Sequence, residues 1–105
     1  MTGKTRKQQL EEMLAEEPND PFLRYGLAME FVSEGNDEEA VRCFDELLTA
    51  APEYVVAYLQ AGQALVRLAR PEQARAVFGR GITAARTLGE QHAADEMEGF
   101  LANLG

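Results

Sequence analysis

The feature that most constrains this chain is a self-similarity with a period of 34 residues. Displacing the sequence by this period superposes apolar and small residues on residues of the same size class. The matched positions are Leu10, Phe44 and Phe78; Leu14, Leu48 and Ile82; Pro18 and Pro52; Leu27 and Ala61; Ala28 and Gly62; Phe31 and Leu65; Ala40 and Ala74. A fixed period of this length is typical of proteins whose repeated units bury their apolar faces against one another.

Apolar residues within each period recur at three, four and seven residues and do not alternate, which predicts α-helices. Leu23, Leu27 and Phe31 form one such stripe. Asp20 is expected as an N-cap, and Gly35 as the residue that ends a helix in the left-handed region. The predicted helices span about residues 5–17, 20–34, 37–50, 53–69, 71–87 and 90–104.

Several other residues predict helix ends and close packing. Asn36 and Glu39 have the spacing of a capping box, and Gly89 is a second candidate for a helix end. Gly62 and Gly81 interrupt apolar helical faces, which indicates a close approach of two helices at each glycine.

The residues inside one period resemble the tetratricopeptide repeat, whose pattern is W-x2-L-G-x2-Y, then A-x3-F, then P. The resemblance rests on Leu27-Ala28, Phe31, Ala40, Phe44 and Pro52, and then on Tyr58, Ala61-Gly62, Leu65, Ala74 and Phe78. Three residues depart from the pattern: Arg24 replaces an aromatic residue, Gly81 an alanine and Arg86 the closing proline.

The resemblance implies an all-α solenoid of antiparallel helix pairs, with six helices, about two and a half repeats and a C-terminal capping helix. Residues 1–105 are expected to form a single domain. Its predicted parts are a mobile N-terminus (1–4), a half repeat (5–18), repeat 1 (21–54), repeat 2 (55–88) and the capping helix (89–105).

Composition argues against several functions. The formal net charge of −8 disfavours nucleic-acid binding, which depends on neutralising phosphates. No apolar run of membrane-spanning length is present, and Cys43 and His92, each the only residue of its type, cannot together form a zinc site. The sequence therefore predicts no enzyme activity, no cofactor, no metal and no membrane contact. The lone thiol and the absence of a signal sequence favour a cytoplasmic location.

Basic residues are concentrated in repeat 2, at Arg67, Arg70, Arg75, Arg80 and Arg86. Two interpretations remain open. The arginines form a docking surface for an acidic partner or a second copy, or they pair with carboxylates of neighbouring helices.

The first helix of repeat 1 carries a second apolar stripe, which packing against the other helix of the same pair does not account for. In the tetratricopeptide proteins that the chain resembles, the residues at these positions line the concave wall. With its equivalents 34 residues later, this set, called the stripe below, comprises Phe22, Tyr25, Met29, Val32, Val56, Leu59, Gln63, Val66 and Arg67. The alternative is that helix packing, or the final helix folding across, covers part of the stripe.

The sequence thus predicts a non-enzymatic adaptor that binds an apolar peptide or helix of a partner protein in a groove lined by the stripe. The alternative is a structural module that uses the groove or the end of the stack for homo-oligomerisation. Tyr25, Met29 and Gln60 replace the Lys and Asn residues with which some tetratricopeptide proteins clamp a C-terminal carboxylate, which argues against that mode of binding.

Overall fold

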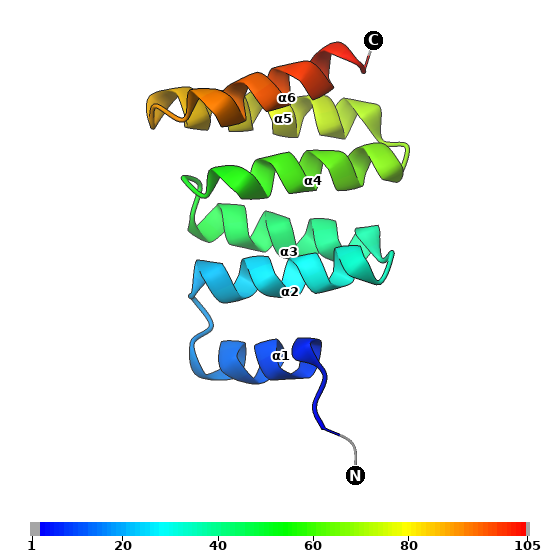
Figure 1. The fold of residues 1–105 in the computed structure, drawn as a ribbon, viewed down its shortest axis with the longest axis vertical. Helices are drawn as coiled ribbons and strands as arrows, with labels where there is room; N and C mark the ends of the chain where they lie inside the picture. The colour runs from blue at the N-terminus through cyan, green and yellow to red at the C-terminus, as the bar shows by residue number, and fades with distance from the viewer. Residues whose placement is uncertain (1–2, 105) are drawn as a thin grey trace.

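The computed structural model describes residues 3–104, which form six α-helices and no strand. The helices are α1 (Arg6–Glu16), α2 (Pro21–Ser33), α3 (Asp37–Ala50), α4 (Val55–Arg67), α5 (Pro71–Thr87) and α6 (Gln91–Ala102). Consecutive helices are antiparallel and pack side by side, so they form a stack that measures 49 × 28 × 20 Å (Figure 1). The predicted all-α solenoid is confirmed, and each helix begins and ends within two residues of its predicted bounds.

Helix ends follow the local signals in the sequence. The Asp20 carboxylate accepts hydrogen bonds from the backbone N–H groups of Phe22 (2.9 Å) and Leu23 (3.2 Å), as an N-cap does. Gly35 and Gly89 both have φ of 76° at the ends of α2 and α5. Of the expected capping box, only one half forms: Asn36 accepts from the backbone of Glu39, whose own carboxylate pairs with Arg42.

The first helix has an N-terminal cap that the sequence analysis did not identify. The Thr5 hydroxyl accepts from the backbone N–H of Gln8 at 3.1 Å, and the Gln8 side chain accepts from the backbone N–H of Thr5 at 2.9 Å. This reciprocal pair is a complete capping box. Residues 1–2 of the predicted mobile N-terminus lie outside the described residues, and the Lys4 ammonium is 2.7 Å from the Glu12 carboxylate.

The core runs along the stack between the helices. Its largest fully buried side chains are Phe44, Leu47, Leu65, Phe78 and Met97. Both predicted close approaches are present. A Cβ atom on Gly62 would lie 2.3 Å from the Phe78 ring, and one on Gly81 would lie 2.5 Å from the Met97 sulfur and from the Cβ of Tyr58. Met97 belongs to α6, so this last helix covers the apolar face of repeat 2.

Arg24 departs from the repeat pattern yet takes over one role of the aromatic residue. In repeat 2 the Tyr58 hydroxyl donates a hydrogen bond to the carbonyl of Pro52 at 2.7 Å. In repeat 1 the Arg24 Nε donates to the carbonyl of Pro18 at 2.8 Å. Both contacts therefore tie a helix to the loop before it at the same repeat position.

Candidate functional site

The stripe residues of α2 lie between the core and the solvent. Phe22 is 68% exposed, whereas Tyr25, Met29 and Val32 are half-buried and pack against the core. A fully buried stripe would belong to the core, and a fully exposed one would have no fixed conformation. These side chains are instead held in place by the core and still present apolar surface.

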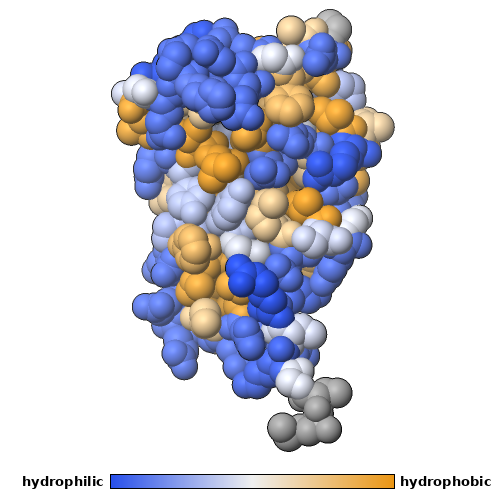
Figure 2. All heavy atoms as spheres, viewed as in Figure 1, coloured by the Kyte–Doolittle hydropathy of each residue, from blue (hydrophilic) through white to orange (hydrophobic). Residues whose placement is uncertain are grey.

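The equivalent residues of α4 are arranged in the same way. Val56 is 39% exposed and Val66 is 42% exposed, while Leu59 and Gln63 are half-buried and Arg67 is exposed. None of the nine stripe residues is fully buried. Figure 1 draws α2 and α6 in front of α3 and α5, and Figure 2 shows this face with apolar clusters near α2 and between α4 and α6, separated by more polar atoms.

Tyr25 is fixed by two aromatic neighbours. Its ring centroid lies 6.1 Å from that of Phe44 and 5.6 Å from that of Tyr54, both in tilted arrangements. Partial burial, with a smaller contribution from Tyr54, raises the pKa of the Tyr25 hydroxyl above its usual value. The hydroxyl therefore stays neutral at physiological pH, and Tyr25 offers a rigid apolar ring with a polar end.

Phe100 of α6 is a candidate site residue that the stripe did not include. It is 37% exposed, and its ring stacks on Phe78 at a centroid distance of 5.6 Å. With Gln63, Val66 and Arg67 it lines a small pocket of about 190 Å³. Phe100 lies 34 residues after Val66, so the repeat period itself contained this signal. The final helix thus adds a wall beside α4 and leaves the stripe residues of α2 and α4 partly exposed.

The arginines of repeat 2 are engaged within the chain. Arg67 donates two hydrogen bonds to the Asp37 carboxylate, at 3.0 and 2.9 Å, and Arg70 donates to Glu38 at 2.8 Å. Further ion pairs join Arg75 to Glu72 at 3.2 Å and Arg86 to Glu98 at 2.7 Å. The Arg80 guanidinium lies 5.5 Å from the centroid of the Tyr58 ring. Pairing with carboxylates of neighbouring helices therefore describes Arg67, Arg70 and Arg86. Arg75 instead pairs within its own helix, and Arg80 is exposed over an aromatic ring.

The residues considered for chemistry do not form a catalytic set. Cys43 is buried, and desolvation raises the pKa of its thiol, which opposes formation of the reactive thiolate. His92 is exposed and lies 3.5 Å from the carboxylate of Glu96 on the same helix. Across residues 3–104 no three His, Cys, Asp or Glu side chains are grouped as a metal site would require.

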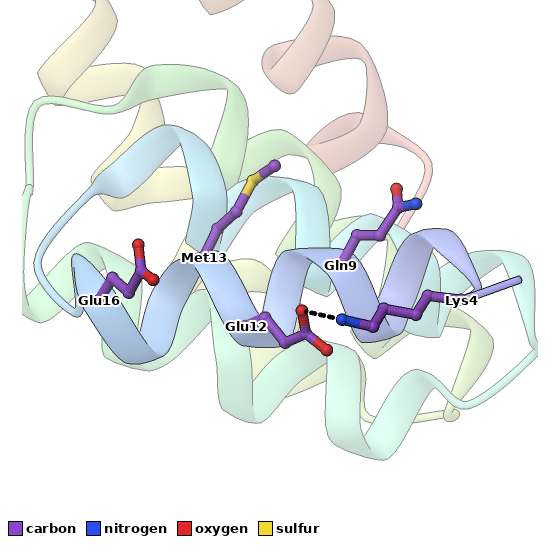
Figure 3. Close-up of a pocket in the computed structure, with 5 residues that line it drawn as sticks. All are labelled: Lys4, Gln9, Glu12, Met13 and Glu16. Atoms are coloured by element: carbon purple, nitrogen blue, oxygen red, sulfur yellow. Dashed lines mark hydrogen bonds and ion pairs between the residues drawn. The ribbon is translucent and has the colours of Figure 1, made fainter.

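A larger hollow lies on the outer surface of α1 (Figure 3). Its volume is about 350 Å³, and its lining residues are Lys4, Gln9, Glu12, Met13 and Glu16. All five come from a single helix and the residues just before it, and Lys4 and Glu12 form an ion pair across it. Without a second element to form an opposite wall, this hollow cannot enclose a ligand. No helix in the described part of the chain is both long enough and apolar enough to cross a membrane.

Comparisons with known proteins identify the family. The sequence pattern of the tetratricopeptide repeat matches residues 23–54 and 55–88. A tetratricopeptide repeat-containing protein of Pseudomonas aeruginosa is 30% identical over 95 residues, which are 90% of each chain. A tetratricopeptide repeat domain protein of Salinibacter ruber, solved by NMR, is 34% identical with a TM-score of 0.78, over 83% of this chain and 88% of that one.

A third likeness extends over nearly the whole fold. A protein of Bordetella parapertussis, whose solution structure is known, has a TM-score of 0.84 and 26% identity, over 97% of this chain and 89% of that one. Two matched repeats, a relative of nearly equal length and the stacked helix pairs all lead to one conclusion. The chain belongs to the tetratricopeptide repeat family.

Proposed function

We propose that this protein is an adaptor that binds an apolar peptide or helix of a partner protein across the stripe. Repeats of this family are generally non-catalytic modules for protein–protein interaction. The observation that carries the finer proposal is the exposure of two pairs of repeat-equivalent side chains. Phe22 and Val56 lie near the starts of α2 and α4, and Val66 and Phe100 lie near the ends of α4 and α6.

The physical basis of binding is the burial of a preformed apolar surface. Tyr25, Met29 and Leu59 are already packed against the core, so a ligand does not have to order them. Burying apolar area stabilises a complex by about 25 cal/mol per Å² before the costs of association are subtracted. The pocket beside Phe100 provides room for one apolar side chain of the ligand.

The test is a selection of binding peptides from a random library, followed by affinity measurements on variants. Phe22→Ala and Val66→Ala are expected to weaken binding about tenfold or more while helicity by circular dichroism stays unchanged, because both side chains are exposed. The matched control is Met13→Ala, which truncates a 51% exposed apolar residue on α1. Equal effects of all three variants, or none, would exclude the stripe as the binding site.

Self-assembly is the second candidate function, either through the stripe or through one end of the stack of helix pairs. Sedimentation velocity at micromolar concentration separates the two functions. A dimer that Phe22→Ala or Val66→Ala converts to a monomer would support homo-oligomerisation, whereas a monomer leaves the stripe available to a different protein.

A further inference from the structure

Most basic side chains of this protein are paired with carboxylates of the same chain, so they contribute little free positive charge around the stripe. Nine of the ten Lys and Arg side chains have a carboxylate within 4.0 Å among residues 3–104. The tenth, Arg80, lies over the Tyr58 ring. The protein therefore uses almost all of its positive charge internally, and its surplus charge consists of carboxylates.

Three of these surplus carboxylates lie at the starts of α2, α4 and α6, the helices that carry the stripe and Phe100. Asp20 immediately precedes α2 and caps it, Glu53 lies two residues before α4, and Glu90 immediately precedes α6. In the described residues none of the three has a Lys, Arg or His within salt-bridge distance. The loops that carry them are on one edge of the stack (Figure 1), which we call the helix-start edge.

The helix-start edge is apolar as well as acidic. Phe22 follows Asp20 by two residues, and Val56 follows Glu53 by three. Both side chains are exposed, at 68% and 39%. At the other end of α4 the charges are already matched, since Arg67 is bound to Asp37. The exposed apolar residues thus extend from a negative edge to an edge whose charges are neutralised.

Charge complementarity then decides which occupant fits this surface. We propose that the stripe binds a basic amphipathic segment of a partner protein, whose Lys or Arg residues lie against the helix-start edge and whose apolar residues cover the stripe as far as Phe100. The inference rests on the proposed function and specifies its ligand. Opposite charges at the rim of an interface steer association and set its orientation.

A second copy of this chain does not meet the same requirement. It would bring a net charge of −8 to a negative edge, with its own cations already paired. Like charges brought together at an interface oppose association, most strongly at low ionic strength where screening is weak. The stripe is therefore expected to remain free of self-association in dilute salt.

Two synthetic peptides test the charge of the ligand. Each has about 18 residues, which is about 27 Å as a helix and fits within the 49 Å stack. Both carry the same Leu and Phe face, and the polar face is Lys in one and Glu in the other. Fluorescence anisotropy in 50 mM and 500 mM NaCl is expected to show the Lys peptide binding about tenfold tighter or more in dilute salt, with a smaller difference in concentrated salt.

Charge-removing variants locate the contact. Glu53→Gln combined with Glu90→Gln is expected to weaken the Lys peptide about fivefold in dilute salt. The control, Glu11→Gln combined with Asp95→Asn, removes the same number of charges. Glu11 is exposed on α1, and Asp95 lies two residues from both Ala93 and Met97, on the opposite side of α6 from them. Equal effects of the two pairs would overturn the assignment to the helix-start edge.

The outcomes separate this inference from the proposed function. If both peptides bind equally and Val66→Ala weakens the binding of both, the stripe is the binding site but its ligand is not required to be basic. If neither peptide binds, or if Phe22→Ala and Val66→Ala leave binding unchanged, the proposed function fails as well. A dimer in dilute salt would also overturn the inference, because the occupant would then be a second copy.

Discussion

The two repeats build the same hairpin from different side chains. Where repeat 2 has Tyr58 and Gly81, repeat 1 has Arg24 and Leu47 at the equivalent positions. Tyr58 is buried against Gly81, whose hydrogen atom leaves room for the ring, while in repeat 1 the small residue is replaced by a fully buried leucine. The helical hairpin therefore does not require a particular residue at either position. It requires that one of the two facing positions supply a large buried side chain.

The two repeats pack different side chains but share the turn that ends their first helix. Both repeats end their first helix with the same hydrogen bonds: Asn36 N–H to Phe31 O at 2.9 Å, and Arg70 N–H to Leu65 O at 2.9 Å. The left-handed residue in these turns is Gly35 in repeat 1 and Ala69 in repeat 2, with φ of 76° and 58°. Repeat 2 thus retains the turn although its residue carries a Cβ atom, which disfavours this conformation.

The largest effect is expected from Leu47→Ala. This side chain is fully buried, and its truncation in repeat 1 should destabilise the protein by about 2–5 kcal/mol through lost burial and a cavity. Chemical denaturation monitored by circular dichroism measures the change. A loss of less than about 1 kcal/mol would mean that repeat 1 closes around a small residue as repeat 2 does, and that the two cores are interchangeable.

Gly81→Ala tests the corresponding close contact in repeat 2. The added Cβ would lie 2.5 Å from Tyr58 Cβ and from the Met97 sulfur, so we expect destabilisation of about 1–3 kcal/mol despite the better helix propensity of alanine. Gly79→Ala is the matched control, because no side chain or neighbouring helix comes within 4 Å of its added Cβ. The control should stabilise α5 by about 0.5–1 kcal/mol. Effects of the same sign in both variants would contradict a tight contact at Gly81.

Exchanging the turn residues should shift stability in opposite directions. Ala69→Gly relieves a positive φ and is expected to stabilise the protein by about 0.5–1 kcal/mol, whereas Gly35→Ala introduces that strain and should cost about 1 kcal/mol. Thermal unfolding of the two single variants and their combination measures both changes. If Ala69→Gly is destabilising, the entropy of the more flexible unfolded chain outweighs the strain.

The smallest expected effect on stability comes from the ion pair between Glu38 of α3 and Arg70 of the loop between α4 and α5. The hydrogen bond from Arg70 lowers the pKa of Glu38 below its usual value. The stabilising contribution of this pair is therefore present above the pKa of Glu38 in the unfolded chain and is lost as the pH falls through the lower pKa in the fold. NMR titration should show that Arg70→Gln raises the pKa of Glu38, and an unchanged value would mean that the pair does not persist in solution.

Much of the fold was available from the sequence because its signals are local or periodic. Asp20 and Gly35 end their helices through contacts with residues a few positions away, and the period placed Phe44 and Phe78 in equivalent core sites. The stripe was predicted in the same way. Phe100 was missed because α6 was interpreted only as a cap, although the period pointed to it.

What the sequence by itself determined is the repeated helical hairpin, its helix ends and the glycines at close contacts, since spacing along the chain sets these features. The tertiary structure alone decided how distant residues are combined. It paired Arg67 with Asp37, brought Phe100 and Gln63 together as walls of one pocket, and held Ala69 in a left-handed turn. The physical reason is that ion pairs, pocket walls and tolerated strain depend on the distance between helices, and that distance is fixed only when every helix of the stack is packed.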